Sequence, residues 1–217
     1  ENGYVVRRNA DGNKDKFSKN PDGTFKSPPG VFDTLSQEAG RYVITTKQGM
    51  RCLFNERGYL SVITDRQQNE IRLTYETGNN LLTRIIDTSG REISLQYNSQ
   101  AKIASITDFV SRVWRYQYAN GNLSSFTAPA TEAFPQGTIT TYGYDENHNL
   151  ISITDPRQTS YLSISYDEQD RAKYLFYSGG WYKFEYRQNL TLYTDGNRPC
   201  DVGRARSKSH LRNDPIS

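Results

Sequence analysis

The residues of this chain that first suggest chemistry are four aspartates at the same place in successive segments. They are Asp65, Asp87, Asp108 and Asp155. Two neighbouring carboxylates can act as general acid and general base, so the recurrence suggests a carboxylate pair. However, aspartate at the end of a strand also caps turns by accepting backbone hydrogen bonds. We interpret the four as turn residues. A weak calcium site between segments is an unsupported alternative, because no dense Asp/Asn/Gly loop is present.

The histidines offer little support for catalysis or metal binding. His148 and His210 are the only two in the chain, and their spacing is not that of a metal site. No His–carboxylate–nucleophile set can be assembled from the sequence, and His148 lies in a predicted turn, where solvation is the simplest interpretation. The sequence therefore predicts no catalytic residue, no cofactor-binding residue and no metal ligand, and indicates that the chain is not an enzyme.

Two tryptophans and two cysteines remain as candidates. Trp114 and Trp181 could stack on sugar rings, but both belong to or adjoin the apolar set of their segments, which favours core packing. Cys52 and Cys200 stand far apart without metal-like spacing, so we expect two unpaired thiols. A carbohydrate-binding surface is therefore kept only as the second hypothesis.

These residues sit in a repeat that organises most of the chain. Each unit ends on an aromatic residue, and the steps between these markers are 21, 22, 21, 26, 22 and 20 residues. The markers are Phe54, Tyr75, Tyr97, Tyr118, Tyr144, Tyr166 and Tyr186. The longest step contains residues 128–137, whose two prolines and one glycine predict an inserted loop. A fixed period of this kind is typical of a repeat architecture.

Within each unit the pattern predicts a hairpin. Apolar residues stand two and four positions before most markers, as Ile71 and Leu73 do before Tyr75, with polar residues between them. This alternation indicates a strand with one apolar face. After a turn comes an apolar pair spaced by three, such as Leu60 and Ile63, which predicts a β-bulge near the turn. The fold class is therefore all-β, with successive antiparallel hairpins of 20–22 residues forming one long sheet.

The segment from Tyr144 to Asp155, closing at Tyr166, resembles the YD repeat of the Rhs proteins, which is similar to repeats in insecticidal toxin-complex C subunits and in teneurins. The resemblance covers residues 41–198. It implies a long, curved β-sheet that spirals into a hollow shell. In bacterial members that shell encloses a toxic C-terminal domain. The self-cleaving aspartate motif and the toxin domain of such proteins have no counterpart here, so neither activity is carried over.

The sequence predicts three parts. Residues 1–40 are expected to form irregular hairpins that cap the sheet, with one helical turn at most between Leu35 and Gly40; residues 41–198 form the repeats; and residues 199–217 form a basic, disordered tail. The net charge of +3 is small and interspersed, which argues against nucleic-acid binding. No apolar run reaches the length of a membrane span. No signal peptide is visible, and we expect a fragment or a processed product.

The predicted function is that of a non-catalytic segment of an Rhs-type shell, secreted or at the cell surface, which encloses and presents a C-terminal toxin. Its expected partners are the rest of the same polypeptide and the toxin cargo, with no cofactor. The alternative is an adhesion or carbohydrate-binding module that contacts a cell-surface glycan. An open sheet has unpaired edges, so self-association of the isolated chain is also predicted.

Overall fold

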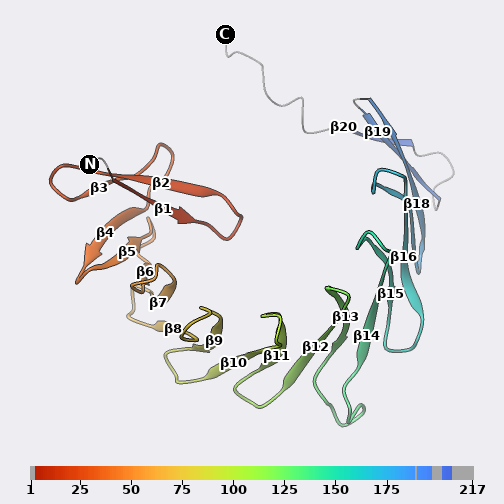
Figure 1. The fold of residues 1–217 in the computed structure, drawn as a ribbon, viewed down its shortest axis with the longest axis horizontal. Helices are drawn as coiled ribbons and strands as arrows, with labels where there is room; N and C mark the ends of the chain where they lie inside the picture. The colour runs from red at the N-terminus through yellow and green to blue at the C-terminus, as the bar shows by residue number, and fades with distance from the viewer. Residues whose placement is uncertain (1–2, 189, 197–201, 207–217) are drawn as a thin grey trace. The chain divides into compact units, whose positions relative to one another are not determined.

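The structure is a computed structural model that describes residues 3–188, 190–196 and 202–206. Within these ranges it contains twenty β-strands and no helix, which confirms the all-β prediction (Figure 1). The chain divides into two compact units, residues 1–111 and residues 112–217, and each is described by itself. The predicted three-part division at residues 40 and 198 stays a prediction.

The first unit begins with a small antiparallel sheet, which we name the cap sheet. Its strands are β1 (Tyr4–Arg8), β2 (Lys14–Lys19) and β3 (Phe25–Lys26). Gly12 and Gly23 have φ angles of 83° and 86°, so each connecting turn uses a backbone conformation that glycine adopts without strain. The two hairpins predicted before the repeats are therefore present.

A second antiparallel sheet forms the rest of the first unit, and each strand pairs with the next in sequence. Its strands are β4 (Thr34–Glu38), β5 (Arg41–Thr45), β6 (Arg51–Phe54), β7 (Leu60–Thr64), β8 (Glu70–Tyr75), β9 (Leu82–Ile86), β10 (Glu92–Tyr97) and β11 (Ile103–Thr107). The prediction of a helical turn between Leu35 and Gly40 is wrong. Ala39 and Gly40 both have positive φ and close a two-residue hairpin, so Glu38 pairs with Arg41.

The second unit repeats the same pairing. Its strands are β12 (Val113–Ala119), β13 (Asn122–Thr127), β14 (Ile139–Tyr144), β15 (Leu150–Thr154), β16 (Ser160–Tyr166), β17 (Ala172–Tyr177), β18 (Gly180–Arg187), β19 (Leu190–Asp195) and β20 (Val202–Arg206). The predicted loop joins β13 to β14. Within the segment predicted to be a basic, disordered tail, Val202–Arg206 pairs with β19. Residues 207–217, which include His210, lie outside the described residues, and so does Cys200.

The predicted bulge occurs in every repeat hairpin except β18–β19. In the first, Leu60 pairs with Phe54 and Val62 pairs with Leu53, so Ser61 is the extra residue. The same shift of register precedes Tyr75, Tyr97, Tyr118, Tyr144 and Tyr166. The spacing of three between the apolar residues of each short strand therefore reflects one bulged residue, which returns both to the same face of the sheet.

Deep burial is confined to the beginning of the chain. The buried apolar side chains of the described residues are Phe17, Leu35, Val43 and Ile44. Phe17 of the cap sheet packs with Leu35 and Ile44, so β1–β3 lie against β4–β6 (Figure 1). In the repeats beyond, apolar side chains are only half-buried or exposed. The repeat sheets are therefore stabilised by contacts between neighbouring strands more than by a deep core.

Candidate functional site

The four recurrent aspartates cap turns, as predicted. Asp65 Oδ1 accepts hydrogen bonds from the backbone N–H groups of Gln67 at 2.8 Å and Asn69 at 2.9 Å. Equivalent bonds reach the carboxylates of Asp87, Asp108 and Asp155. Because these carboxylates are engaged by their own turns, they have the geometry of structural caps rather than of a catalytic pair. Among the described residues, no group of three or more His, Cys, Asp or Glu is placed to hold a metal ion.

The capped turns share one backbone form. The backbone N–H of the capping residue donates to the carbonyl oxygen four residues further on, as that of Asp65 does to Asn69 at 3.0 Å. This hydrogen bond encloses a three-residue loop. The last loop residue has a positive φ and is often not glycine: φ is 66° at Gln68, 66° at His148 and 64° at Gln158. This is the hairpin loop in which a left-handed residue forms a bulge. The sequence signal for it is the aspartate or asparagine at the cap position.

Asp167 has the most strongly perturbed pKa among these caps. Side-chain hydrogen bonds from Arg171, at 2.8 Å from Nε and 2.6 Å from Nη2, lower the pKa of Asp167 from 3.8 to about 2. Backbone N–H groups of Arg171 and Gln169 act in the same direction. The Arg171 guanidinium also lies 4.3 Å from the ring centroid of Tyr186, so one arginine contacts both the turn and the neighbouring strand.

We expect Asp167 to titrate near pH 2 in an NMR titration of its side-chain carboxyl carbon. Since its pKa is lowered on folding, the bond stabilises the fold above the unfolded pKa of about 4 and the effect is lost as pH falls toward about 2. Arg171→Leu should return the Asp167 titration toward pH 4, whereas Lys173→Leu, two residues further on in β17, should not. A wild-type midpoint near pH 4 would contradict the ion pair.

Tyrosine hydroxyls join four of the hairpins to the preceding strand, an arrangement that we call the tyrosine clamp. Tyr75 on β8 donates to the carbonyl oxygen of Leu60 on β7, and Tyr97 on β10 donates to Leu82 on β9, both at 2.8 Å. The second unit repeats the bond, also at 2.8 Å, from Tyr166 to Leu150 and from Tyr186 to Ala172. Burial raises the pKa of Tyr75, Tyr97 and Tyr166.

Sequence reasoning identified these tyrosines as strand-ending aromatics but did not predict the hydroxyl bond. The available signal was the use of Tyr, rather than Phe, at all markers but the first. A phenylalanine would fill the same apolar space, so repeated Tyr indicates a partner for the hydroxyl.

Removing one clamp hydroxyl should cost about 1 kcal/mol of the free energy of unfolding, because one part-buried hydrogen bond is lost. We expect this for Tyr166→Phe, measured by urea denaturation, with faster amide exchange in β15 and β16. Tyr161→Phe is the matched control: it lies on the same strand, is 41% exposed and forms no recorded hydroxyl bond within the described part of the chain. Equal effects of the two substitutions would argue against the clamp.

His148 is exposed, as predicted, but it is not only solvated. Its Nδ1 atom lies 3.0 Å from the side-chain nitrogen of Asn122, a residue of the previous hairpin. Nearby, Asn147 and Asn149 donate to Asp170 Oδ1 at 3.0 Å and 2.9 Å. Turns of successive hairpins are thus tied together along one edge of the sheet, so His148 has a structural partner.

The tryptophans are placed as packing residues. Trp114 on β12 and Trp181 on β18 are both half-buried. A Cβ atom built on Gly196 would overlap the Trp181 indole, so the backbone of Gly196 lies directly on that ring. A ring covered in this way is a poor platform for a sugar, which favours the packing interpretation for Trp181.

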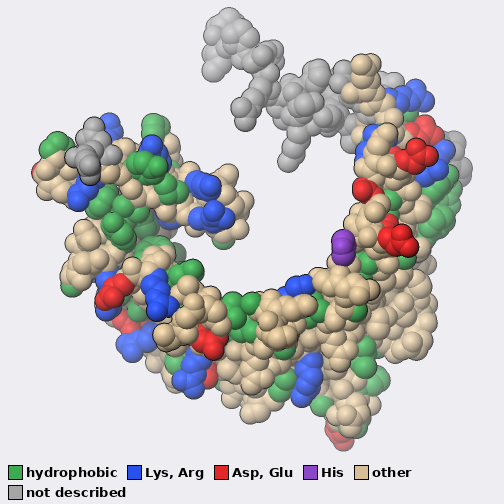
Figure 2. All heavy atoms as spheres, viewed as in Figure 1, with side chains coloured by type: hydrophobic (Ala, Val, Ile, Leu, Met, Phe, Trp, Pro, Cys, Tyr) green, Lys and Arg blue, Asp and Glu red, His purple; other side chains and the backbone are tan. Residues whose placement is uncertain are grey.

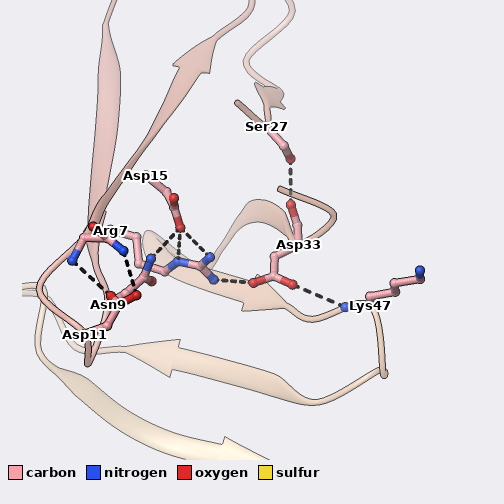
Figure 3. A network of polar contacts seen from close by, with 8 residues as sticks. Arg7, Asn9, Asp11, Asp15, Ser27, Asp33 and Lys47 are labelled. Atoms are coloured by element: carbon pink, nitrogen blue, oxygen red, sulfur yellow. Dashed lines mark hydrogen bonds and ion pairs between the residues drawn. The ribbon is translucent and has the colours of Figure 1, made fainter. Parts of the chain in front are cut away.

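A polar network fixes the cap sheet to the repeat sheet (Figure 3). Arg7 on β1 contacts Asp15 on β2 at 2.6 Å and Asp33, just before β4, at 2.5 Å. Ser27 Oγ donates to the Asp33 carbonyl oxygen, and the backbone N–H of Lys47 donates to the Asp33 carboxylate. Hydrogen bonds from Asn9 and Arg7 lower the pKa of Asp15. Sequence reasoning missed this network, because its members come from separate segments without a shared pattern.

Together, the capped turns, the tyrosine clamp and the pairing of each strand with the next define a β-hairpin repeat protein of the YD type. Residues 34–201 match the family model described as "Teneurin YD-shell". The chain therefore belongs to the teneurin YD-shell family, which confirms the predicted YD-repeat resemblance.

Two curated relatives come from Bacillus. The chain is 30% identical over 201 residues to "tRNA3(Ser)-specific nuclease WapA" of Bacillus spizizenii, covering 64% of this chain and 9% of the relative. It is 32% identical over 187 residues to "tRNA nuclease WapA" of Bacillus subtilis, covering 65% of this chain and 8% of the relative. The chain thus spans less than a tenth of the length of these relatives.

Solved structures with a similar fold include a crystal structure of TcdB2-TccC3-Cdc42, at a TM-score of 0.43 and 12% identity, covering 90% of this chain and 14% of that one. A Photorhabdus luminescens Tc holotoxin pore matches at a TM-score of 0.42 and 12% identity, covering 94% of this chain and 14% of that one. Within the described residues, no helix is long and apolar enough to cross a membrane.

Proposed function

We propose that the chain is a non-catalytic part of a shell wall that encloses and presents an effector domain of the same polypeptide. The observation that carries the proposal is the family match over residues 34–201, the part of the chain in which hairpins follow one another from β4 to β20. Within each unit, the hairpins form an unbroken antiparallel sheet, and such a sheet suits a wall better than a site that binds and converts a substrate. Many of the described carboxylates are engaged in turns and ion pairs, which supports a structural role.

The partners in this proposal are the remaining part of the polypeptide and its effector cargo, with export to the cell surface or the medium. The relatives carry nuclease names while this chain spans less than a tenth of their length. A nuclease-type effector elsewhere in the polypeptide therefore fits the proposal, and the present residues would act by excluding proteases and solvent from it.

Limited proteolysis of the complete polypeptide tests this function. We expect the effector segment to survive protease within the shell and to be digested quickly when expressed alone. Combining Tyr75→Phe, Tyr97→Phe, Tyr166→Phe and Tyr186→Phe should open the wall and speed digestion, whereas Tyr161→Phe should not. Equal digestion of the enclosed and the isolated effector would contradict enclosure, and nuclease activity of the present chain alone would contradict its non-catalytic role.

The adhesion or carbohydrate-binding alternative has less support, because Trp181 is covered by Gly196. A glycan array decides it: binding that is lost on Trp181→Ala, with the fold retained by circular dichroism, would favour that alternative. We expect no such binding.

A further inference from the structure

One face of the cap sheet packs against β4–β6, and the opposite face is exposed to solvent. Val5, Phe17 and Phe25 belong to the apolar cluster beside β4–β6, and Arg7 and Asp15 belong to the polar network. Side chains alternate along a strand, so their neighbours point the other way. We name these the outer cap face. Its members, all exposed, are Tyr4, Val6, Arg8, Lys14, Lys16, Ser18 and Lys26.

The outer cap face carries four cations and, among the described residues, no carboxylate. Arg8 pairs directly with Lys14 across β1 and β2, an arrangement of like charges that destabilises a sheet. The acids of this region are engaged elsewhere: Asp15 binds Arg7 on the inner face, and Asp11 and Asp22 accept hydrogen bonds within their own turns. Within the described residues no ion pair neutralises these cations. Figure 2 shows Lys and Arg side chains gathered over this part of the chain.

Beside the cations lie exposed apolar groups. Tyr4 is 59% exposed and Val6 is 45% exposed. Lys16 Nζ lies 3.9 Å from the centre of the Tyr4 ring, which keeps that cation at the surface beside the aromatic group. Tyrosine has an apolar ring and a polar hydroxyl, so it is suited to the boundary between water and an apolar phase.

We propose that the outer cap face binds an anionic lipid surface, with the phosphates of lipid headgroups contacting Arg8, Lys14, Lys16 and Lys26 while Tyr4 and Val6 enter the headgroup region. Closely spaced cations next to exposed apolar side chains are the two features that peripheral membrane binding requires. The face is a sheet of three short strands, and its exposed Tyr4 and Val6 suit the apolar boundary of a lipid layer better than a phosphodiester backbone, which offers Val6 no apolar environment. A lipid surface therefore fits better than a nucleic acid. The proposal is independent of the shell function, because it concerns the cap sheet alone.

Vesicle co-sedimentation of the whole chain tests this proposal. One set of vesicles is phosphatidylcholine alone, and the other is phosphatidylcholine mixed with phosphatidylglycerol. We expect binding only to the mixed vesicles, with a large loss between ~0.05 M and ~0.5 M salt, because headgroup charges are screened. Each cation near such a surface contributes about fivefold to the partition coefficient, equivalent to about 1 kcal/mol.

Replacing all four cations with glutamine should therefore weaken vesicle binding by about a hundredfold or more. The variant should remain folded, since it relieves like-charge repulsion, and circular dichroism checks this. A matched control removes four exposed arginines outside the cap sheet and should retain binding within about threefold. The control positions are Arg57, Arg72, Arg157 and Arg187.

Three results would overturn the proposal. They are failure of the wild-type chain to bind the mixed vesicles, equal loss of binding in both quadruple variants, and binding to a soluble nucleic acid without any binding to vesicles. Tyr4→Ala tests the apolar contribution separately, because it leaves all four cations in place. It should weaken vesicle binding several-fold while leaving the salt dependence of binding unchanged.

Discussion

Phe17→Ala should release the cap sheet from the rest of the first unit. Phe17 has no exposed surface, and it is the cap residue at the centre of the cluster with Leu35 and Ile44. Truncating a buried phenylalanine loses the favourable free energy of removing its ring from water and leaves a cavity. The typical cost is about 3–5 kcal/mol of the free energy of unfolding. Few other buried contacts hold β1–β3, so we expect this loss to exceed what the small sheet can tolerate.

Amide exchange measures this effect by region. In Phe17→Ala the amides of β1–β3 should exchange quickly, whereas those of β14–β19 should keep their protection, because stability in a repeat array is local. Val6→Ala is the control, since Val6 is on the neighbouring cap strand but 45% exposed on the outer face. Retained protection of β1–β3 in Phe17→Ala would show that the cap sheet is held by other contacts.

Arg7→Met should produce the second largest loss, about 2–3 kcal/mol, measured by urea denaturation near neutral pH. The substitution keeps most of the side-chain volume but removes the cation between Asp15 and Asp33. Both carboxylates are largely buried, at 15% and 22% side-chain exposure, so they lose a charged partner that water cannot fully replace. Arg8→Met on the same strand is the control, because Arg8 is exposed and forms no recorded ion pair among the described residues.

The difference in free energy of unfolding between wild type and Arg7→Met should also depend on pH. Hydrogen bonds from Asn9 and then Arg7 lower the pKa of Asp15 in the folded state, so the ion pair with Arg7 stabilises the cap above the unfolded pKa of about 4 and is lost as pH falls through the folded value. The stability difference between wild type and Arg7→Met should therefore shrink below about pH 4. A difference that stays constant down to pH 2 would show that Arg7 acts independently of its carboxylate partners, for example through its cation–π contact with the Phe17 ring 5.7 Å away.

Local patterns predicted the repeats well, because the information is contained within each unit of sequence. Alternation before Tyr75 or Tyr166 defines a strand, the spacing of Leu60 and Ile63 defines the bulge, and Asp65 marks the capped turn. Each of these depends on residues a few positions apart. The family resemblance was carried by the same short-range features, and the match over residues 34–201 bears it out.

Features that join distant segments could not be predicted in this way. Arg7, Asp15 and Asp33 have no common spacing, so their network becomes visible only when β1, β2 and the segment before β4 are brought together. Residues 35–40 were misinterpreted because they lack the repeat signature; the hairpin at Ala39 and Gly40 depends on pairing with β5. Likewise, β20 follows from pairing with β19 rather than from a periodicity of its own.

The clamp bonds between neighbouring hairpins also bear on how the chain would respond to force. Beyond Ile44 the described residues include no buried apolar side chain, so no deep core resists the separation of one hairpin from the next. Drawn from one end, such a chain should lengthen stepwise, one hairpin at a time, with each step releasing ~70 Å of extended backbone. A sheet joined by many similar, modest bonds can thus be unravelled in steps without a single large barrier.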